Sequence, residues 1–132
     1  MIVVDTNIIV YLHIEGEFTA DAEKLYQADS NWAAPLLWRS EFRNVLLGYF
    51  KRQQFSFLDY KAIVRQAESL LHDFEYDISS DDLFYLLEAA NCSAYDCEFV
   101  ALANKLNVPL ITQDKKILQS FPNVAYSLRD VV

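Results

Sequence analysis

Four carboxylates lie beside apolar segments, where acidic residues are uncommon. Asp5 follows the apolar run IVV, Asp114 comes two residues after VPLIT, and Glu41 lies in the second turn of the helix expected after WAAP. Asp96 has apolar residues three, four and seven positions further on. Uncompensated carboxylates held close together repel one another or take up protons, and a divalent cation removes this conflict. Oxygen ligands without histidine or thiolate favour Mg²⁺ or Mn²⁺ over zinc.

Small polar side chains accompany these acids in the sequence. Hydroxyl and amide groups at such positions orient carboxylates, or water molecules bound to a metal ion. The sequence therefore predicts a supporting role for four residues, which are Thr6, Asn7, Ser40 and Thr112.

Each of the four acids also has an ordinary structural role open to it. Asp5 and Asp114 stand where each would cap the N-terminus of a following helix, a common role for Asp. The segment SAYD has the form of a capping box, with Ser93 as N-cap and Asp96 three residues later. Glu41 could form an ion pair within its helix or extend to water, and Arg39 and Arg43 are nearby, although neither is three or four residues away. Each acid alone fits such a role, and only the combination of all four favours a site.

Short apolar runs alternate with longer amphipathic segments along the chain. Apolar residues that recur every three or four positions predict helices, and the short runs predict buried strands. We expect strands at 2–4, 31–35, 74–78, 108–112 and 123–128, and helices at 6–14, 19–29, 35–52, 56–73, 79–90, 93–106 and 115–121. This alternation is typical of an α/β fold with a parallel sheet. Ligands of such sheets bind beyond the carboxyl ends of the strands, where we expect the four acids to meet.

The composition limits the possible partners and settings. With 19 acidic and 11 basic residues, the formal charge is −8, which argues against general attraction to phosphate unless bound cations reverse the local sign. Most other acids, Glu98 among them, are predicted on solvent-exposed faces. Cys92 and Cys97 would point in different directions if both lay on one helix, which argues against a structural zinc site. No apolar stretch reaches the roughly 18 residues of a membrane helix, and no secretory signal is present, so we expect a cytoplasmic protein.

Three segments carry a more specific signature, namely VVDTN, SEF and SAYDCEFVALANKLNVPLITQDKKIL, with the acids in the order Asp, Glu, Asp, Asp. In these features the chain resembles a PIN domain, and its size is similar to that of the VapC toxins of type II toxin–antitoxin pairs. The resemblance implies a single PIN-like domain over residues 1–132. It also implies a three-layer α/β/α fold, with five parallel strands in the order 3-2-1-4-5.

The resemblance further implies a metal-dependent endoribonuclease that uses one or two Mg²⁺ or Mn²⁺ ions. Position by position, the four acids match the catalytic and metal-binding residues of the family. The expected partners are an RNA substrate, a cognate antitoxin and a second copy of the chain, with no membrane association. Lys115 and Lys116, next to Asp114, are candidates for contact with the RNA backbone, and the alternative is that both are simply solvated.

Two other classes of function compete with this interpretation. The chain could serve as an interaction module, because its predicted helical hairpin carries apolar residues that would dock a partner protein: Leu46, Tyr49, Phe50, Phe55, Phe57 and Leu58. Phosphoryl transfer to a small molecule is disfavoured. A haloacid-dehalogenase-type phosphatase needs D-x-D after its first strand, and a response-regulator receiver needs paired acids there, whereas this chain has D-T-N.

Overall fold

The computed structural model describes residues 1–132 and is built around a sheet of five parallel strands. Across the sheet the strands follow the order β3-β2-β1-β4-β5. Their bounds are Ile2–Val4 for β1, Trp32–Pro35 for β2, Glu75–Tyr76 for β3, Leu110–Ile111 for β4 and Ala125–Tyr126 for β5. This order confirms the prediction from the sequence, and it places β1 and β4 side by side.

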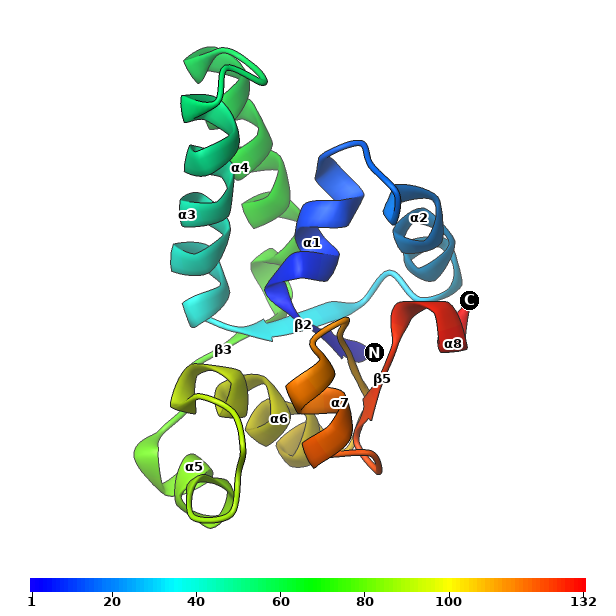
Figure 1. Ribbon diagram of the computed structural model, residues 1–132, viewed down its shortest axis with the longest axis vertical. Coiled ribbons are helices and arrows are strands. Elements are labelled where there is room, and N and C mark those ends of the chain that lie inside the picture. The colour runs from blue at the N-terminus through cyan, green and yellow to red at the C-terminus, as the bar shows by residue number, and fades with distance from the viewer.

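Eight α-helices and one short 3₁₀-helix, η1, connect and cover the strands. Their bounds are Thr6–His13 for α1, Thr19–Ala28 for α2, Leu37–Lys51 for α3, Phe57–Leu71 for α4, His72–Phe74 for η1, Ser80–Leu87 for α5, Ala94–Leu106 for α6, Lys115–Ser120 for α7 and Leu128–Val131 for α8. Figure 1 shows α1 to α4 on one side of the sheet and α5 to α7 on the other. The predicted three-layer α/β/α arrangement is therefore confirmed.

Local capping signals explain where several helices begin. Ser56 and Ser79 each form a complete capping box with the aspartate three residues further on. The C-terminal region departs from the prediction, because the strand expected over 123–128 is limited to β5 and is followed by α8. The Ser127 hydroxyl accepts a hydrogen bond from the backbone N–H of Asp130 at 3.3 Å. This Ser-x-x-Asp signal starts a helix where the apolar alternation indicated a strand.

The hydrophobic core lies between the sheet and the helices on its two faces. Val3 and Val4 of β1 are fully buried, as are Ile8 and Ile9 of α1 on one face and Phe99 of α6 on the other. Removing this apolar surface from water is the main force that holds the layers together, and it fixes the position of β1. None of the helices has the length and apolar character required to cross a membrane.

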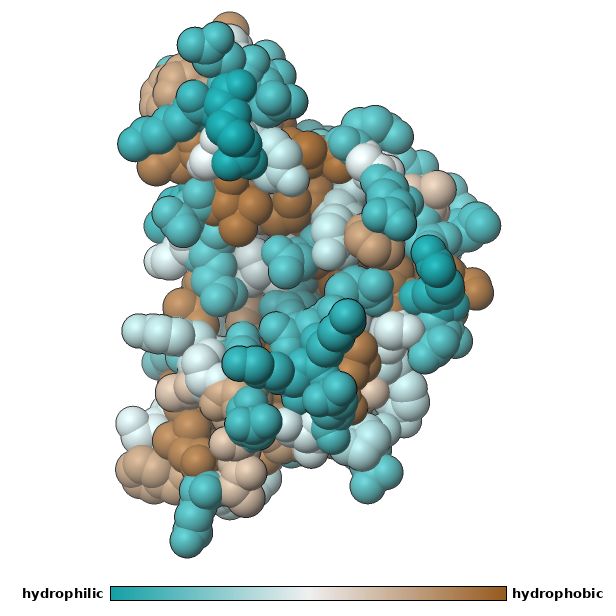
Figure 2. Space-filling model, viewed as in Figure 1, coloured by the Kyte–Doolittle hydropathy of each residue, from teal (hydrophilic) through white to brown (hydrophobic).

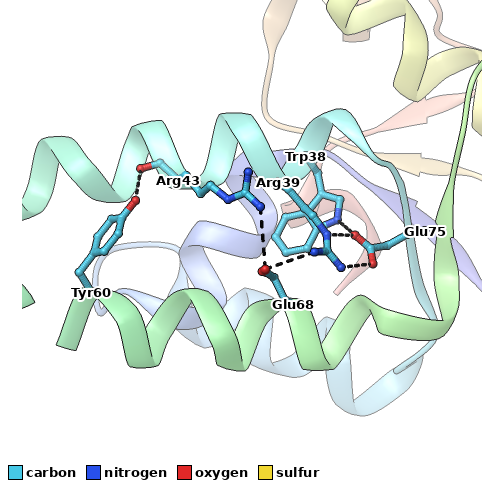
Figure 3. Close-up of polar contacts among 6 residues, drawn as sticks. All are labelled: Trp38, Arg39, Arg43, Tyr60, Glu68 and Glu75. Atoms are coloured by element: carbon cyan, nitrogen blue, oxygen red, sulfur yellow. Dashed lines mark hydrogen bonds and ion pairs between the residues drawn. The ribbon is translucent and has the colours of Figure 1, made fainter. Parts of the chain in front are cut away.

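Helices α3 and α4 form a hairpin that projects beyond the sheet (Figure 1), and an ion-pair network fastens its base (Figure 3). Arg39 donates from Nε to Oε2 of Glu75 at 2.6 Å and from Nη2 to Oε1 at 2.7 Å. The indole Nε1 of Trp38 donates to the same carboxylate at 2.7 Å. Glu68 of α4 accepts from Arg39 at 3.3 Å. The hydrogen bonds from Arg39 lower the pKa of Glu75, and the network ties the first turn of α3 to β3 and α4.

We expect the Glu75→Ala variant to lose about 2 to 4 kcal/mol of unfolding free energy, because it leaves the Trp38 indole and the Arg39 guanidinium without their shared acceptor. Urea unfolding at pH 7 measures this loss. The matched control is Glu68→Ala, which removes only the two longer, more exposed pairs with Arg39 and Arg43 and should cost less than about 1 kcal/mol. Equal losses in the two variants would contradict the dominant role of Glu75.

Candidate active site

The four predicted acids come from elements that meet at the carboxyl-terminal edge of the sheet. Asp5 follows β1, and Asp114 follows the neighbouring strand β4. Glu41 lies one turn into α3, and Asp96 lies in the first turn of α6. The charges of Glu41 and Asp96 raise the pKa of Asp5, and that of Asp114 raises the pKa of Asp96. The structure therefore brings the four acids into electrostatic contact.

Asp5 is the most buried member of this group, with 8% of its surface exposed. It occupies the N-cap of α1, where its Oδ1 accepts from the backbone N–H of Thr6 at 2.8 Å. Its Oδ2 accepts from the Thr112 hydroxyl at 2.7 Å. Burial raises the pKa of Asp5 to about 6, although both hydrogen bonds oppose this change. Asp5 can therefore cap α1 and also belong to the acid group. The cap uses one hydrogen bond to Oδ1, whereas the interaction with the other acids depends on the charge of the carboxylate.

Glu41 is held by a residue that directly follows Asp5. The Thr6 hydroxyl donates to Oε1 of Glu41 at 2.6 Å. Burial raises the pKa of Glu41, the hydrogen bond from Thr6 opposes the change, and the charges of Asp96 and Glu98 add to it. Thr6 therefore couples the start of α1 to the acid on α3, as its predicted supporting role requires.

The two arginines near Glu41 do not pair with it. Arg39 pairs with Glu75 and Glu68, and Arg43 lies 4.0 Å from Glu68. Because residues two positions apart point to opposite sides of a helix, Glu41 and these arginines occupy different faces of α3. The ion-pair alternative for Glu41 is therefore wrong.

Thr112 links the acids of the two central strands. Its hydroxyl donates to Asp5 and accepts from the backbone N–H of Asp114 at 3.0 Å. Asp114 also caps α7, since its Oδ1 accepts from the N–H of Ile117 at 3.0 Å. Its other carboxylate oxygen makes no hydrogen bond. The structural role considered for Asp114 is therefore confirmed, and one oxygen is left for a ligand.

Asp96 forms only half of the capping box considered for it. The Ser93 hydroxyl accepts from the N–H of Asp96 at 3.1 Å, but the carboxylate does not complete the box in return. Burial and then the charge of Asp114 raise the pKa of Asp96, against smaller opposing effects of Ser93 and Lys116. In the complete capping boxes at α4 and α5, by contrast, the aspartate carboxylate also accepts a hydrogen bond from the backbone N–H of the N-cap serine.

The prediction that Cys92 and Cys97 point apart is wrong, because their Sγ atoms lie 3.8 Å from each other. Cys92 is not on the helix but precedes the N-cap Ser93, so the chain folds it back over Cys97. The two residues take the N′ and N4 positions, where an apolar pair fixes the entry of the chain into a helix. Both thiols are free. The pair therefore helps to hold the turn that carries Asp96.

Two of the four predicted supporting residues, Asn7 and Ser40, make no hydrogen bond to the acids, and their side chains are exposed. Lys115 and Lys116 are exposed in the first turn of α7. Lys116 lies near enough to Asp96 to lower its pKa. The structure thus supports a close structural role for Thr6 and Thr112, while Asn7, Ser40 and Lys115 remain at the surface.

Glu98 is an acid that the sequence interpretation placed wrongly in solvent. It is half-buried in α6, where burial and then the charge of Asp77 raise its pKa, and it acts in turn on Glu41. Its neighbours three and four residues further on, Ala101 and Leu102, are apolar. Glu98 nevertheless differs from Asp96 in the sequence, because the residue seven positions after it is Lys105 rather than an apolar one.

The acid group fits a hard divalent cation by its chemistry. None of the four acids forms an ion pair with a lysine, arginine or histidine within 4.0 Å. All potential metal ligands in the group are oxygen atoms, which Mg²⁺ and Mn²⁺ prefer. No three acidic, histidine or cysteine side chains converge closely enough to enclose an ion by themselves. A cation here would therefore need water molecules to complete its shell, as is usual for Mg²⁺.

Comparison with known proteins places this arrangement in a family. The family model for the PIN domain matches residues 2–124. Similar solved structures include PAE2754 from Pyrobaculum aerophilum, with 20% identity, a TM-score of 0.72 and coverage of 98% of this chain and 92% of that one.

Two further structures have the same fold. A toxin–antitoxin complex from Klebsiella pneumoniae contains a chain with 21% identity, a TM-score of 0.66 and coverage of 97% and 98%. FitAcB from Neisseria gonorrhoeae has 11% identity, a TM-score of 0.75 and coverage of 99% and 100%. No curated protein matches by sequence. On the family match, which spans nearly its whole length, this chain belongs to the PIN domain family.

Proposed function

We propose that this PIN-domain chain is a metal-dependent endoribonuclease and the toxin of a type II toxin–antitoxin pair. PIN domains are generally nucleases, which sets the class of reaction. The observation that carries the proposal is the buried Asp5 carboxylate, with a pKa near 6, next to three further acids and without a cationic partner. Such a site is electrostatically unfavourable unless it holds a cation. The structural similarity to a protein of a toxin–antitoxin complex supports the toxin role.

Asp5 and Asp96 are our candidates for direct ligands of Mg²⁺ or Mn²⁺, and Asp114 is our candidate for a ligand through water. Mg²⁺ usually keeps several waters and binds only one or two carboxylates directly, so it does not need three converging side chains, which this site lacks. When bound, the ion supplies Lewis-acid chemistry toward the scissile phosphate.

The chain's own residues position the reacting groups in the proposed hydrolysis. Thr112 holds the Asp5 carboxylate and the backbone of Asp114, and Thr6 holds one oxygen of Glu41. We propose that the second oxygen of Glu41 either binds the ion or positions the attacking water. The water oxygen bonds to phosphorus and gives up a proton to the surrounding water, the bond to the leaving ribose oxygen breaks, and that oxygen takes up a proton from the surrounding water. Hydrogen bonds that fix the carboxylates in advance reduce the reorganisation needed during the reaction.

The direct test is RNA cleavage under defined ion conditions. We expect the purified protein to cut labelled single-stranded or structured RNA with Mg²⁺ or Mn²⁺ and to be inactive in EDTA. The Asp96→Asn variant, shown to be folded by circular dichroism, should be inactive in all buffers. Glu23→Gln, which removes an exposed acid of α2, is the matched control and should be fully active. Cleavage that persists in EDTA or in Asp96→Asn would overturn the metal mechanism.

A role as an interaction module is the second candidate, and the tip of the α3–α4 hairpin favours it. Phe57 is 50% exposed and Leu58 is 72% exposed, which is unusual for large apolar side chains. A cognate antitoxin is the partner that we propose in either case, and a homodimer and a cytoplasmic setting remain predictions. Tight binding of a neighbouring gene product without any RNA cleavage would favour this second candidate.

A further inference from the structure

The α3–α4 hairpin carries a charge opposite in sign to the rest of the chain. Six of the 11 basic residues lie within residues 37–71, together with only three of the 19 acidic ones. This segment therefore has a formal charge of +3, whereas the remaining residues carry −11. The net charge of −8 argues against a polyanionic partner only if charge is spread evenly, and here it is not. The hairpin is therefore the basic part of an otherwise acidic chain.

Four of these basic side chains are free of acidic partners. Lys51 and Arg52 stand at the end of α3, and Lys61 and Arg65 are one turn apart on α4. All four are exposed, and none forms an ion pair within 4.0 Å. The two other arginines of the hairpin are held at its base by the network described above. These four lysine and arginine side chains are therefore available to an external anion.

Aromatic rings are interleaved with these bases. Phe57 stacks on Tyr60, with ring centroids 5.4 Å apart and planes inclined by 14°, and Nζ of Lys61 lies 5.7 Å from the Phe57 ring centroid. Cζ of Arg52 lies 5.0 Å from the ring centroid of Tyr49. Figure 2 shows strongly hydrophilic side chains beside apolar ones along this projection at the top of the molecule. Phe57 is exposed, whereas Tyr49 and Tyr60 are partly buried. Lysine and arginine side chains interleaved with aromatic rings are typical of surfaces that bind single-stranded nucleic acid.

The basic hairpin and the candidate active site share helix α3. Helix α3 carries Glu41 near its start and Lys51 at its end, ten residues or about 15 Å further along the axis. The acid group repels phosphate, so an RNA strand needs attraction from another part of the surface to reach it. We propose that the α3–α4 hairpin binds the RNA that the acid group cleaves. The four unpaired lysine and arginine side chains of the hairpin would contact the phosphates of the RNA. This inference rests on the proposed function and names the surface that holds its substrate.

Two pairs of substitutions with equal charge test the inference. Lys61→Ala with Arg65→Ala removes two bases from the hairpin, and alanine favours the helix that they occupy. Lys24→Ala with Arg129→Ala removes one lysine and one arginine from exposed positions elsewhere. Fluorescence anisotropy of a labelled 20-nucleotide single-stranded RNA, in EDTA, measures binding without cleavage.

We expect the hairpin pair to weaken RNA binding on the order of tenfold at low salt, and to reduce the slope of log K against log salt by about 1.4. The control pair should bind as the wild type does. In Mg²⁺, the hairpin pair should raise KM for cleavage and leave kcat unchanged, because its bases lie away from the reacting atoms.

Equal losses in both pairs, or no loss in the hairpin pair, would overturn the inference. If cleavage is normal while the hairpin pair binds RNA normally, the proposed function stands and only the hairpin assignment falls. If the hairpin pair loses RNA binding but the wild type never cleaves RNA, the hairpin assignment stands and the proposed function falls. Labelled poly-L-glutamate is the probe for an acidic protein partner. Tighter binding of this probe than of RNA, lost in the hairpin pair, would overturn RNA as the occupant.

Discussion

The Asp5→Asn variant should be more stable than the wild-type protein above pH 6 in the absence of divalent cations, and at least about a hundredfold slower in RNA cleavage. Both effects come from the same buried carboxylate. An asparagine keeps the shape of the side chain, with an oxygen to accept from the Thr6 N–H and an amide to face the Thr112 hydroxyl. It removes the charge that a cation would bind.

The pH dependence of this gain follows from the raised pKa of Asp5. The pKa lies at about 6 in the folded protein, against 3.8 for an unperturbed aspartate. Between these values the folded state binds more protons than the unfolded state, so the wild type loses stability as pH rises through this window. The loss is complete above pH 6 and amounts to about 3 kcal/mol. Glu41 and Asp96, whose pKa values are also raised, contribute in the same direction.

Urea unfolding of both proteins in EDTA, from pH 4 to pH 8, measures the effect. The unfolding free energy of Asp5→Asn should exceed that of the wild type only slightly near pH 4, and by between about 1 and 3 kcal/mol at pH 8. Glu88→Gln, which neutralises an exposed acid, should show no such growth. A variant that is less stable than the wild type at pH 8 would show that the Asp5 carboxylate is needed for folding rather than kept for ligand binding.

The fold follows from local patterns in the sequence to a large extent. Apolar runs such as IVV locate the buried strands, and capping signals such as those at Ser56 and Ser79 fix the helix starts. The strand order in the prediction came from the resemblance to PIN domains, because periodicity does not encode which strands are neighbours. The two-residue lengths of β3, β4 and β5 were not predictable either, since strand ends depend on pairing with distant segments.

Residue types in the sequence predict which acids form the site. The hydrogen bonds that hold these acids join residues that are far apart in the sequence. Asp5 and Thr112 are 107 residues apart, and no sequence spacing foretells the hydrogen bond between them. Likewise, the two-residue spacing places Arg39 and Arg43 on another face of α3 than Glu41, but their partners Glu75 and Glu68 come from distant segments. The cysteine pair was misjudged because Cys92 was assigned to the helix that it precedes.

A divalent cation should reverse the instability of the acid group. A ligand at a hundred times its dissociation constant stabilises the folded state by about 2.7 kcal/mol, which for a domain of this size raises Tm by roughly 10 °C. Binding requires ionised carboxylates, so the rise should be large at pH 8 and small at pH 5, below the pKa of Asp5. The Asp5→Asn variant lacks the most buried ligand and should respond weakly at both pH values.

The most direct test of the acid group as a cation site is the Mn²⁺ dependence of Tm at pH 8, measured for the wild type, Asp5→Asn and the exposed-acid control Glu88→Gln. Mn²⁺ should raise Tm by roughly 10 °C at saturation in the wild type and the control, and by less than about 2 °C in Asp5→Asn. If Mn²⁺ leaves the wild-type Tm unchanged, or raises it equally in Asp5→Asn, the four acids do not form the proposed cation site.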